Sequence, residues 1–137
     1  MAAYVTRREE FSAAHRLFNP SFSDARNEEV FGKCNNPRGH GHNYIIEVTV
    51  AGQPDPETGM VIDLRKLSGI INDAVISKVD HRHLNEDVEF LRGVIPTAEN
   101  LAEKFWELLR PRISDGTLCS VKLYESAQNA AEYRGEQ

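Results

Sequence analysis

Apolar and polar residues alternate along several stretches of the chain, and this alternation predicts β-strands. The stretch that carries Tyr44, Ile46 and Val48 is the most strand-like, because it is rich in β-branched and aromatic side chains. Turn-forming residues separate these stretches from one another. The predicted strands are residues 4–15, 43–50, 60–62, 118–125 and 130–134.

Two other stretches repeat their apolar residues every three or four positions, which predicts amphipathic helices. Asp63 can cap the first helix and Thr97 the second, because both side chains accept hydrogen bonds from first-turn backbone N–H groups. The apolar stripes are Leu67, Ile70, Ile71, Ala74 and Val75 in the first helix, and Ala98, Leu101, Ala102, Phe105, Leu108 and Leu109 in the second. The element order ββ(β)ααββ indicates a single α+β domain over residues 1–137.

Residues 17–39 are dense in Asn, Pro, Gly and Ser, which is the composition of turns. We therefore predict one long loop between the first two strands. A loop of this length inside a compact domain usually carries function.

Composition narrows the class of protein. The chain has 137 residues, of which 40% are hydrophobic and 27% charged, with a formal net charge of -5. A negative charge argues against general nucleic-acid binding, which depends on a basic surface. Since no apolar run approaches a membrane span and the two cysteines cannot form a disulfide framework, we expect a soluble protein of the cytoplasm.

The histidines give the strongest chemical signal. His40 and His42 share a parity with the apolar face of the strand that follows them, so both rings should point to one side. Alone, a His-Gly-His sequence could be a chance pair in a loop. His15 on the neighbouring strand supplies a third imidazole, and three histidines with one open position are typical of a catalytic zinc site. Iron and copper are the alternative metals for such a site, but a set of imidazole ligands without a carboxylate most simply suits zinc.

The two cysteines differ in their surroundings. Cys34 lies in a polar loop beside Lys33, where a nearby cation would favour the thiolate that acts as a base or nucleophile. The alternative is an ordinary surface cysteine. Cys119 is predicted to share a strand face with Val121 and Leu123, so we expect it to be inert core.

Asp80 and His81 suggest a carboxylate that orients an imidazole, as a proton shuttle requires. Adjacent residues do not normally hydrogen-bond side chain to side chain, so a polar pair at a helix end is an equal alternative. His83 could contribute, although a surface position is commoner for such a residue.

Glu125 ends an apolar strand face, where a carboxylate is costly unless it is paired. Either a basic residue of the chain satisfies it, or it awaits a ligand that offers two donors side by side, such as an aminopyrimidine edge. Thr97 is most simply a helix cap, and Glu99 in the first turn favours the helix dipole.

Several motifs together resemble the 6-pyruvoyl-tetrahydropterin synthase family. They are residues 11–17 (FSAAHRL), residues 31–44 (FGKCNNPRGHGHNY), Asp80-His81, residues 96–100 (PTAEN) and Glu125. The resemblance spans nearly the whole chain and keeps these motifs in order.

This resemblance implies the tunnel fold, in which a four-stranded antiparallel sheet carries two helices on one face and trimers close a barrel. Two trimers would stack into a homohexamer. It also implies a zinc-dependent carbon–oxygen lyase of tetrahydrobiopterin biosynthesis. Such an enzyme converts 7,8-dihydroneopterin triphosphate to 6-pyruvoyl-tetrahydropterin and triphosphate, with one zinc ion per subunit and with Mg²⁺ as a candidate second ion on the triphosphate.

Carried over by position, the resemblance assigns roles that agree with the chemistry above. The implied zinc ligands are His15, His40 and His42, and the implied proton-transfer residues are Cys34, Asp80 and His81. The implied pterin anchor is Glu125, assisted by Thr97 and Glu99. Arg7, Arg8, Arg16, Lys33 and Arg38 are near the site by chain position, but the sequence does not select which of them hold the triphosphate.

Three alternatives remain. A related enzyme of queuosine biosynthesis, 6-carboxy-tetrahydropterin synthase, shares zinc, fold and substrate. The five residues between Cys34 and His40 favour the pyruvoyl enzyme, since the cysteine of the carboxy enzyme tends to lie nearer the histidine pair. A non-catalytic pterin- or metal-binding module would keep the fold. A zinc hydrolase would use metal-bound hydroxide, but no carboxylate adjoins the histidines in the sequence.

Overall fold

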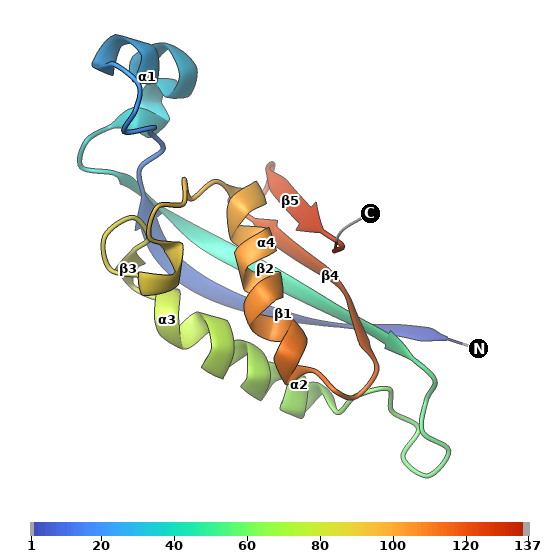
Figure 1. Cartoon of the computed structure of the whole chain (residues 1–137). Coiled ribbons are helices and arrows are strands. Elements are labelled where there is room, and N and C mark those ends of the chain that lie inside the picture. The colour runs from blue at the N-terminus through green and yellow to red at the C-terminus, as the bar shows by residue number, and fades with distance from the viewer. Residues whose placement is uncertain (1, 136–137) are drawn as a thin grey trace.

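The computed structural model describes residues 2–135, and a single β-sheet organises them (Figure 1). Its long strands are β1 (Ala3–His15), β2 (His40–Gly52), β4 (Thr117–Tyr124) and β5 (Ala130–Tyr133). These four pair with one another in antiparallel fashion and confirm the predicted antiparallel sheet. A two-residue strand, β3 (Arg82–His83), extends the sheet to the order β3-β1-β2-β4-β5.

Two helical segments cover one face of this sheet, as the apolar stripes predict (Figure 1). The first runs from α2 (Leu64–Ile71) through a π-helical turn (Asn72–Ile76) into the short α3 (Ser77–Val79), and the second is α4 (Ala98–Leu109). Both predicted caps are present. The Asp63 side chain accepts a hydrogen bond from the Arg65 N–H, and that of Thr97 from the Asn100 N–H. Among the described residues, no helix has the length and apolar character to cross a membrane.

The core lies between the sheet and these helices. Phe11 and Tyr44, on adjacent strands, stack with ring centroids 4.8 Å apart, and Phe105 of α4 meets Phe11 edge-on. All three side chains are buried, and aromatic rings of this size dominate the apolar area that a small core removes from water. The core therefore fixes the end of β1 and the start of β2 against α4.

Two predictions about the connecting segments are wrong. Within the predicted loop 17–39, α1 (Asp24–Phe31) and a 3-10 turn (Gly32–Asn35) form, and α1 projects beyond the end of the sheet (Figure 1). Its buried residue is Asn27, so the helix has no apolar stripe that the sequence could reveal. Residues 60–62 form no strand; Val61 and Ile62 form a bend, and Ile62 enters the core just before the Asp63 cap.

The segment after α3 contains a strand that the sequence does not predict. It runs along the free edge of β1 and forms β3, which pairs in parallel with Ala13 and Ala14. The Ser12 N–H donates to Asp80 Oδ1 over 2.9 Å, and the Leu84 N–H donates to the Ala14 carbonyl over 2.7 Å. Because a short edge strand has no long alternating pattern, the sequence could not reveal it.

Gly39 forms the turn directly before His40, with a φ of 77° that favours glycine. A Cβ atom at this position would lie 2.8 Å from His83 Nε2 and 3.0 Å from the His15 carbonyl oxygen. The carbonyl belongs to the sheet and cannot rotate away. Close backbone packing therefore determines where β2 begins.

We expect Gly39→Ala to lower the free energy of unfolding more than Gly59→Ala does. Gly59 has a φ of 74° but open space around it, so its substitution costs only the left-handed penalty of about 1–2 kcal/mol. Gly39→Ala adds a steric cost of about 1–3 kcal/mol. Urea unfolding of both variants measures the difference, and equal costs would contradict the close packing of this turn.

Candidate metal centre

Three imidazoles converge where β1 ends and β2 begins. The register pairs His15 with His40 and Ala13 with His42, which places the predicted ligands on neighbouring strands. One nitrogen from each of His15, His40 and His42 lies within 4.8 Å of the other two. His15 Nε2 is 3.2 Å from His40 Nε2, close to the separation of about 3.3 Å that tetrahedral zinc with bonds of about 2.0–2.1 Å imposes.

The buried His15 ring has a fixed orientation. Its Nδ1 lies 2.8 Å from the Pro96 carbonyl oxygen and 3.2 Å from the Tyr44 hydroxyl. A proton on Nδ1 donates to that carbonyl and leaves the Nε2 lone pair free toward the other imidazoles. Burial lowers the pKa of His15 to about 4, which outweighs the raising effect of the Pro96 bond. The ring is therefore neutral near pH 7, as a metal ligand must be.

The other two histidines carry polar atoms that the protein does not satisfy. His40 Nδ1 and His42 Nε2 are buried and have no hydrogen-bond partner among the described residues. Burial lowers the pKa of His42 against the opposing effect of Glu125, so this ring is also neutral near pH 7. An unpaired buried nitrogen is costly, and a metal ion would satisfy His42 Nε2, whereas His40 would bind the ion through Nε2, the nitrogen that faces His15. The residues present therefore fit a divalent metal with nitrogen ligands.

Glu125, the implied pterin anchor, lies beside this centre. Its Oε1 is 3.5 Å from His42 Nε2, and with Glu99 it lines a hollow of about 590 Å³ between the start of α4 and the β4–β5 hairpin. No basic residue appears among the residues that line this hollow. Thr97 is not one of them, since its hydroxyl caps α4. Glu125 and Glu99 are thus brought together, whereas Thr97 serves the helix.

Cys34 lies in the 3-10 turn after α1 and is half-buried. Its carbonyl oxygen accepts a hydrogen bond of 2.8 Å from the Leu17 N–H, and Leu17 follows His15 by two residues. The turn that carries the thiol is thus attached to the chain just beyond the first histidine. This end of the long insertion between β1 and β2 is therefore anchored two residues after His15.

Asp80 and His81 contact each other directly, which the sequence argument against neighbouring pairs did not expect. Asp80 Oδ2 is 3.0 Å from His81 Nδ1, and the N–H of Ser12 lowers the pKa of the Asp80 carboxyl. His81 adopts a left-handed φ of 60°, rare for a residue with a Cβ. This backbone turn places the exposed ring against the preceding carboxylate.

Cys119 corrects a further prediction. The register between β2 and β4 shifts at Thr49, which pairs with Ser120, whereas Val50 pairs with Leu118. Cys119 is left as the extra residue of a β-bulge. It therefore does not share the face of Val121, and its half-buried thiol lies 3.4 Å from the Thr49 carbonyl.

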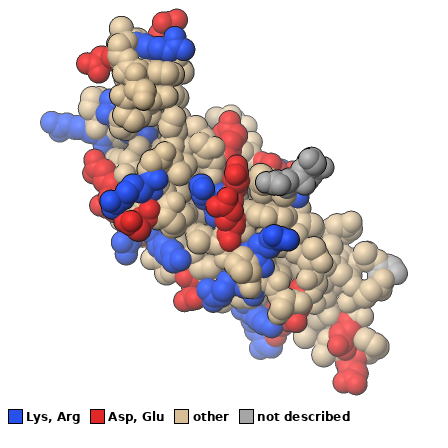
Figure 2. Space-filling model, viewed as in Figure 1, with Lys and Arg blue, Asp and Glu red and all other residues tan. Residues whose placement is uncertain are grey.

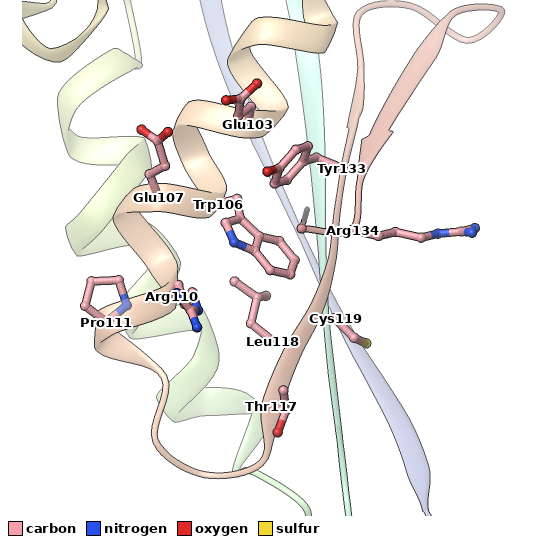
Figure 3. Close-up of a pocket in the computed structure, with 11 residues that line it drawn as sticks. Glu103, Trp106, Glu107, Arg110, Pro111, Thr117, Leu118, Cys119, Tyr133 and Arg134 are labelled. Carbon is pink, nitrogen blue, oxygen red and sulfur yellow. The ribbon is translucent and has the colours of Figure 1, made fainter. Parts of the chain in front are cut away.

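A larger cavity, of about 930 Å³, lies between α4, β4 and β5 (Figure 3). Trp106 and Tyr133 meet edge-on there, and Cys119 lines it, whereas none of the predicted site residues does.

On the face shown in Figure 2, positive and negative side chains are interspersed, unlike the continuous basic surface that nucleic acids require.

Two of the five basic residues near the site by chain position are engaged elsewhere. Arg7 pairs with Glu9 over 2.9 Å, and Arg8 pairs with Glu47 over 2.8 Å, both in the middle of β1 rather than at its His15 end. Their position argues against a role at the metal centre.

The fold and the site together define a tunnel-fold protein with a three-histidine centre able to hold a metal. The family model described as 6-pyruvoyl tetrahydropterin synthase matches residues 4–136, and the chain belongs to this family.

Named relatives agree with this assignment. The chain is 46% identical to the human 6-pyruvoyl tetrahydrobiopterin synthase, across 98% of this chain and 92% of the relative. The Drosophila melanogaster protein of the same name is also 46% identical, across 97% and 80%. The solved structure of Caenorhabditis elegans 6-pyruvoyl tetrahydropterin synthase superposes with a TM-score of 0.94 at 42% identity, covering 99% of this chain and 97% of that one. The 6-carboxy-5,6,7,8-tetrahydropterin synthase of Aquifex aeolicus is 30% identical across 92% of this chain and 94% of the relative.

We expect His42→Ala to lower zinc affinity by more than about 100-fold, since loss of a ligand exceeds the cost of losing a ligand's supporting hydrogen bond. His83→Ala is the matched control, because His83 is near the turn but outside the three-nitrogen group. The zinc content of both variants is measured by metal analysis after dialysis against a buffer that contains zinc. Loss of zinc from both variants, or from neither, would contradict the assignment.

Proposed function

We propose that this protein is a zinc-dependent lyase that converts 7,8-dihydroneopterin triphosphate to 6-pyruvoyl-tetrahydropterin and triphosphate, in tetrahydrobiopterin biosynthesis. The observation that carries the proposal is the group of three converging imidazoles, with a carboxylate hollow at its side, in a chain of this family. The 46% identity to synthases of this name, against 30% to the carboxy relative, favours the pyruvoyl product.

His15, His40 and His42 hold the ion in this proposal, and the lowered pKa values of His15 and His42 favour the neutral form that binds a metal. A zinc ion there supplies a Lewis acid that lowers the cost of negative charge on the substrate's side-chain oxygens. Pro96 and Tyr44 keep the first ring from rotating. The chain thus provides a rigid centre with an open side.

Cys34 and the Asp80–His81 pair handle the protons. As a thiolate, Cys34 takes a proton from a side-chain carbon of the substrate, and the contact of 3.0 Å between Asp80 and His81 holds the imidazole in one orientation. The exposed ring of His81 can exchange its proton with water. One group, the Cys34 thiolate, therefore removes a proton from carbon, and a separate group, the Asp80–His81 pair, supplies or accepts protons elsewhere on the substrate.

Glu125 anchors the pterin. An ionised carboxylate can accept two parallel N–H donors from an aminopyrimidine edge, and the residues that line its hollow include no basic competitor. Glu99 lies across the same hollow and can assist. Thr97 assists pterin binding indirectly, because it caps the start of α4 and so sets the position of Glu99 in the first turn.

Further parts of the proposal rest on the family. The active form is a homohexamer of two stacked trimers, located in the cytoplasm, with neither a membrane nor nucleic acid as a partner. Mg²⁺ accompanies the triphosphate as a second ion, because hard phosphate oxygens suit it. Among the basic residues near the site, Lys33 and Arg38 are exposed and adjacent to the Cys34 turn, which makes them candidates for phosphate contact.

The direct test is product analysis by mass spectrometry after incubation with dihydroneopterin triphosphate. We expect triphosphate and a product that a pterin reductase converts onward to a biopterin. A carboxylated pterin with acetaldehyde would instead identify the queuosine enzyme, and unchanged substrate from zinc-loaded protein would favour a non-catalytic module.

Cys34→Ala should reduce kcat by about 100-fold or more, because a positioned base contributes about 10²–10⁴-fold. Zinc content and pterin affinity should stay within about twofold of the parent, since the thiol is not among the proposed ligands. Cys119→Ser is the control and should keep its activity. Full turnover by Cys34→Ala would favour a zinc hydrolase mechanism instead.

Glu125→Gln should weaken pterin affinity by about tenfold or more, through loss of a charged acceptor, with zinc content unchanged. Glu103→Gln removes an exposed carboxylate of α4 outside this hollow and serves as the control. Isothermal titration with a pterin that lacks the triphosphate isolates the ring contact. Equal affinities for parent and Glu125→Gln would remove the anchor role.

A further inference from the structure

The backbone of Arg16, the residue after His15, is held by the side chain of Asn85. Asn85 Oδ1 accepts a hydrogen bond of 2.8 Å from the Arg16 N–H, and Asn85 Nδ2 donates one of 2.8 Å to the Arg16 carbonyl. One amide side chain thereby satisfies both polar groups of one residue, as a neighbouring strand would.

This clamp continues the edge pairing of β1 beyond its last strand partner. The Ala14 carbonyl accepts from the Leu84 N–H over 2.7 Å, so the residues on both sides of His15 are bonded to the segment after β3. Asn85 is itself held, because its N–H lies 3.3 Å from His83 Nδ1. The chain around His15 therefore has little freedom to move along the sheet edge.

The side chain of Arg16 extends this attachment to the thiol-bearing turn. Its Nε donates to the Asn35 carbonyl over 2.9 Å and its Nη2 to Asn35 Oδ1 over 3.0 Å. The guanidinium also lies 4.0 Å from the centre of the Phe18 ring, which restricts its rotamers. Asn35 is buried and follows Cys34 directly.

We propose that Asn85 is a positioning residue which, acting through Arg16, fixes the separation between the three-histidine centre and the Cys34 thiol. The proposal rests on the proposed function for its catalytic meaning, since that function needs base and metal at the same substrate. Within the described part of the chain, the Asn85 side chain makes its hydrogen bonds to Arg16 and none to the three histidines or Cys34, so it acts through Arg16 and is not itself catalytic. It goes beyond the roles that the sequence motifs assign.

The test measures the mobility of the turn without any substrate. In zinc-loaded Asn85→Ala, iodoacetamide should alkylate Cys34 about tenfold faster than in the parent, because loss of buried hydrogen bonds raises the population of locally open states. Peptide mass spectrometry follows each cysteine separately. Cys119, on β4, is an internal control, and its rate should stay within about twofold.

Variants and kinetics complete the test. Asn72→Ala removes an amide that bonds the Ser68 carbonyl on α2, far from Arg16 in sequence, and should leave the Cys34 rate unchanged. Asn85→Asp keeps the acceptor for the Arg16 N–H, so it provides a milder variant if Asn85→Ala does not fold. For Asn85→Ala, kcat should fall by about tenfold with KM and zinc content within about twofold.

The outcomes separate this inference from the proposed function. An unchanged Cys34 rate in both Asn85 variants, or equal acceleration of Cys34 and Cys119, would overturn the positioning role. A parent protein that forms no pterin product would overturn the proposed function, and the alkylation rates would still decide whether Asn85 holds the turn.

Discussion

The antiparallel pairing of β1 with β2 is the constraint on which the site depends. It sets His15 opposite His40 and, two residues back, Ala13 opposite His42. Because side chains alternate along a strand, this register places all three rings together. A slip of one residue would turn one strand's rings to the other face and disperse the group. The apolar residues that bury the sheet against α4 therefore also fix the metal centre.

Burial at the edge of the core favours the neutral form of His15 and His42. Removal from water disfavours the charged form, so the pKa of His15 falls to about 4 and that of His42 also falls. The Pro96 carbonyl, at the start of α4, selects the tautomer of the first ring. The same helix end lies beside the Glu125 hollow. One helix terminus thus connects the metal centre to the proposed pterin pocket.

The sequence predicts those features that follow from periodicity or from a single capping side chain. The alternation through Phe11 and Tyr44 predicts the long strands and the shared face of the histidines, and Asp63 predicts where α2 begins. Features held by polar contacts between distant residues were missed. They include α1, whose buried residue is an asparagine, the β3 edge strand, and the bulge at Cys119. The hydrogen bonds of β3 and of the bulge join residues far apart in sequence, which no local pattern encodes. Those of α1 join Asn27 to Asn19 and are polar, so they leave no apolar periodicity.

The central claim is that three imidazoles of this chain form a metal site with an open position. X-ray absorption at the zinc edge, on protein loaded with about one equivalent of zinc, tests it most directly. The account predicts three imidazole nitrogens and one further light ligand at about 2.0–2.1 Å. A sulfur ligand at about 2.3 Å would contradict it, because Cys34 would then be a ligand and could not serve as the base.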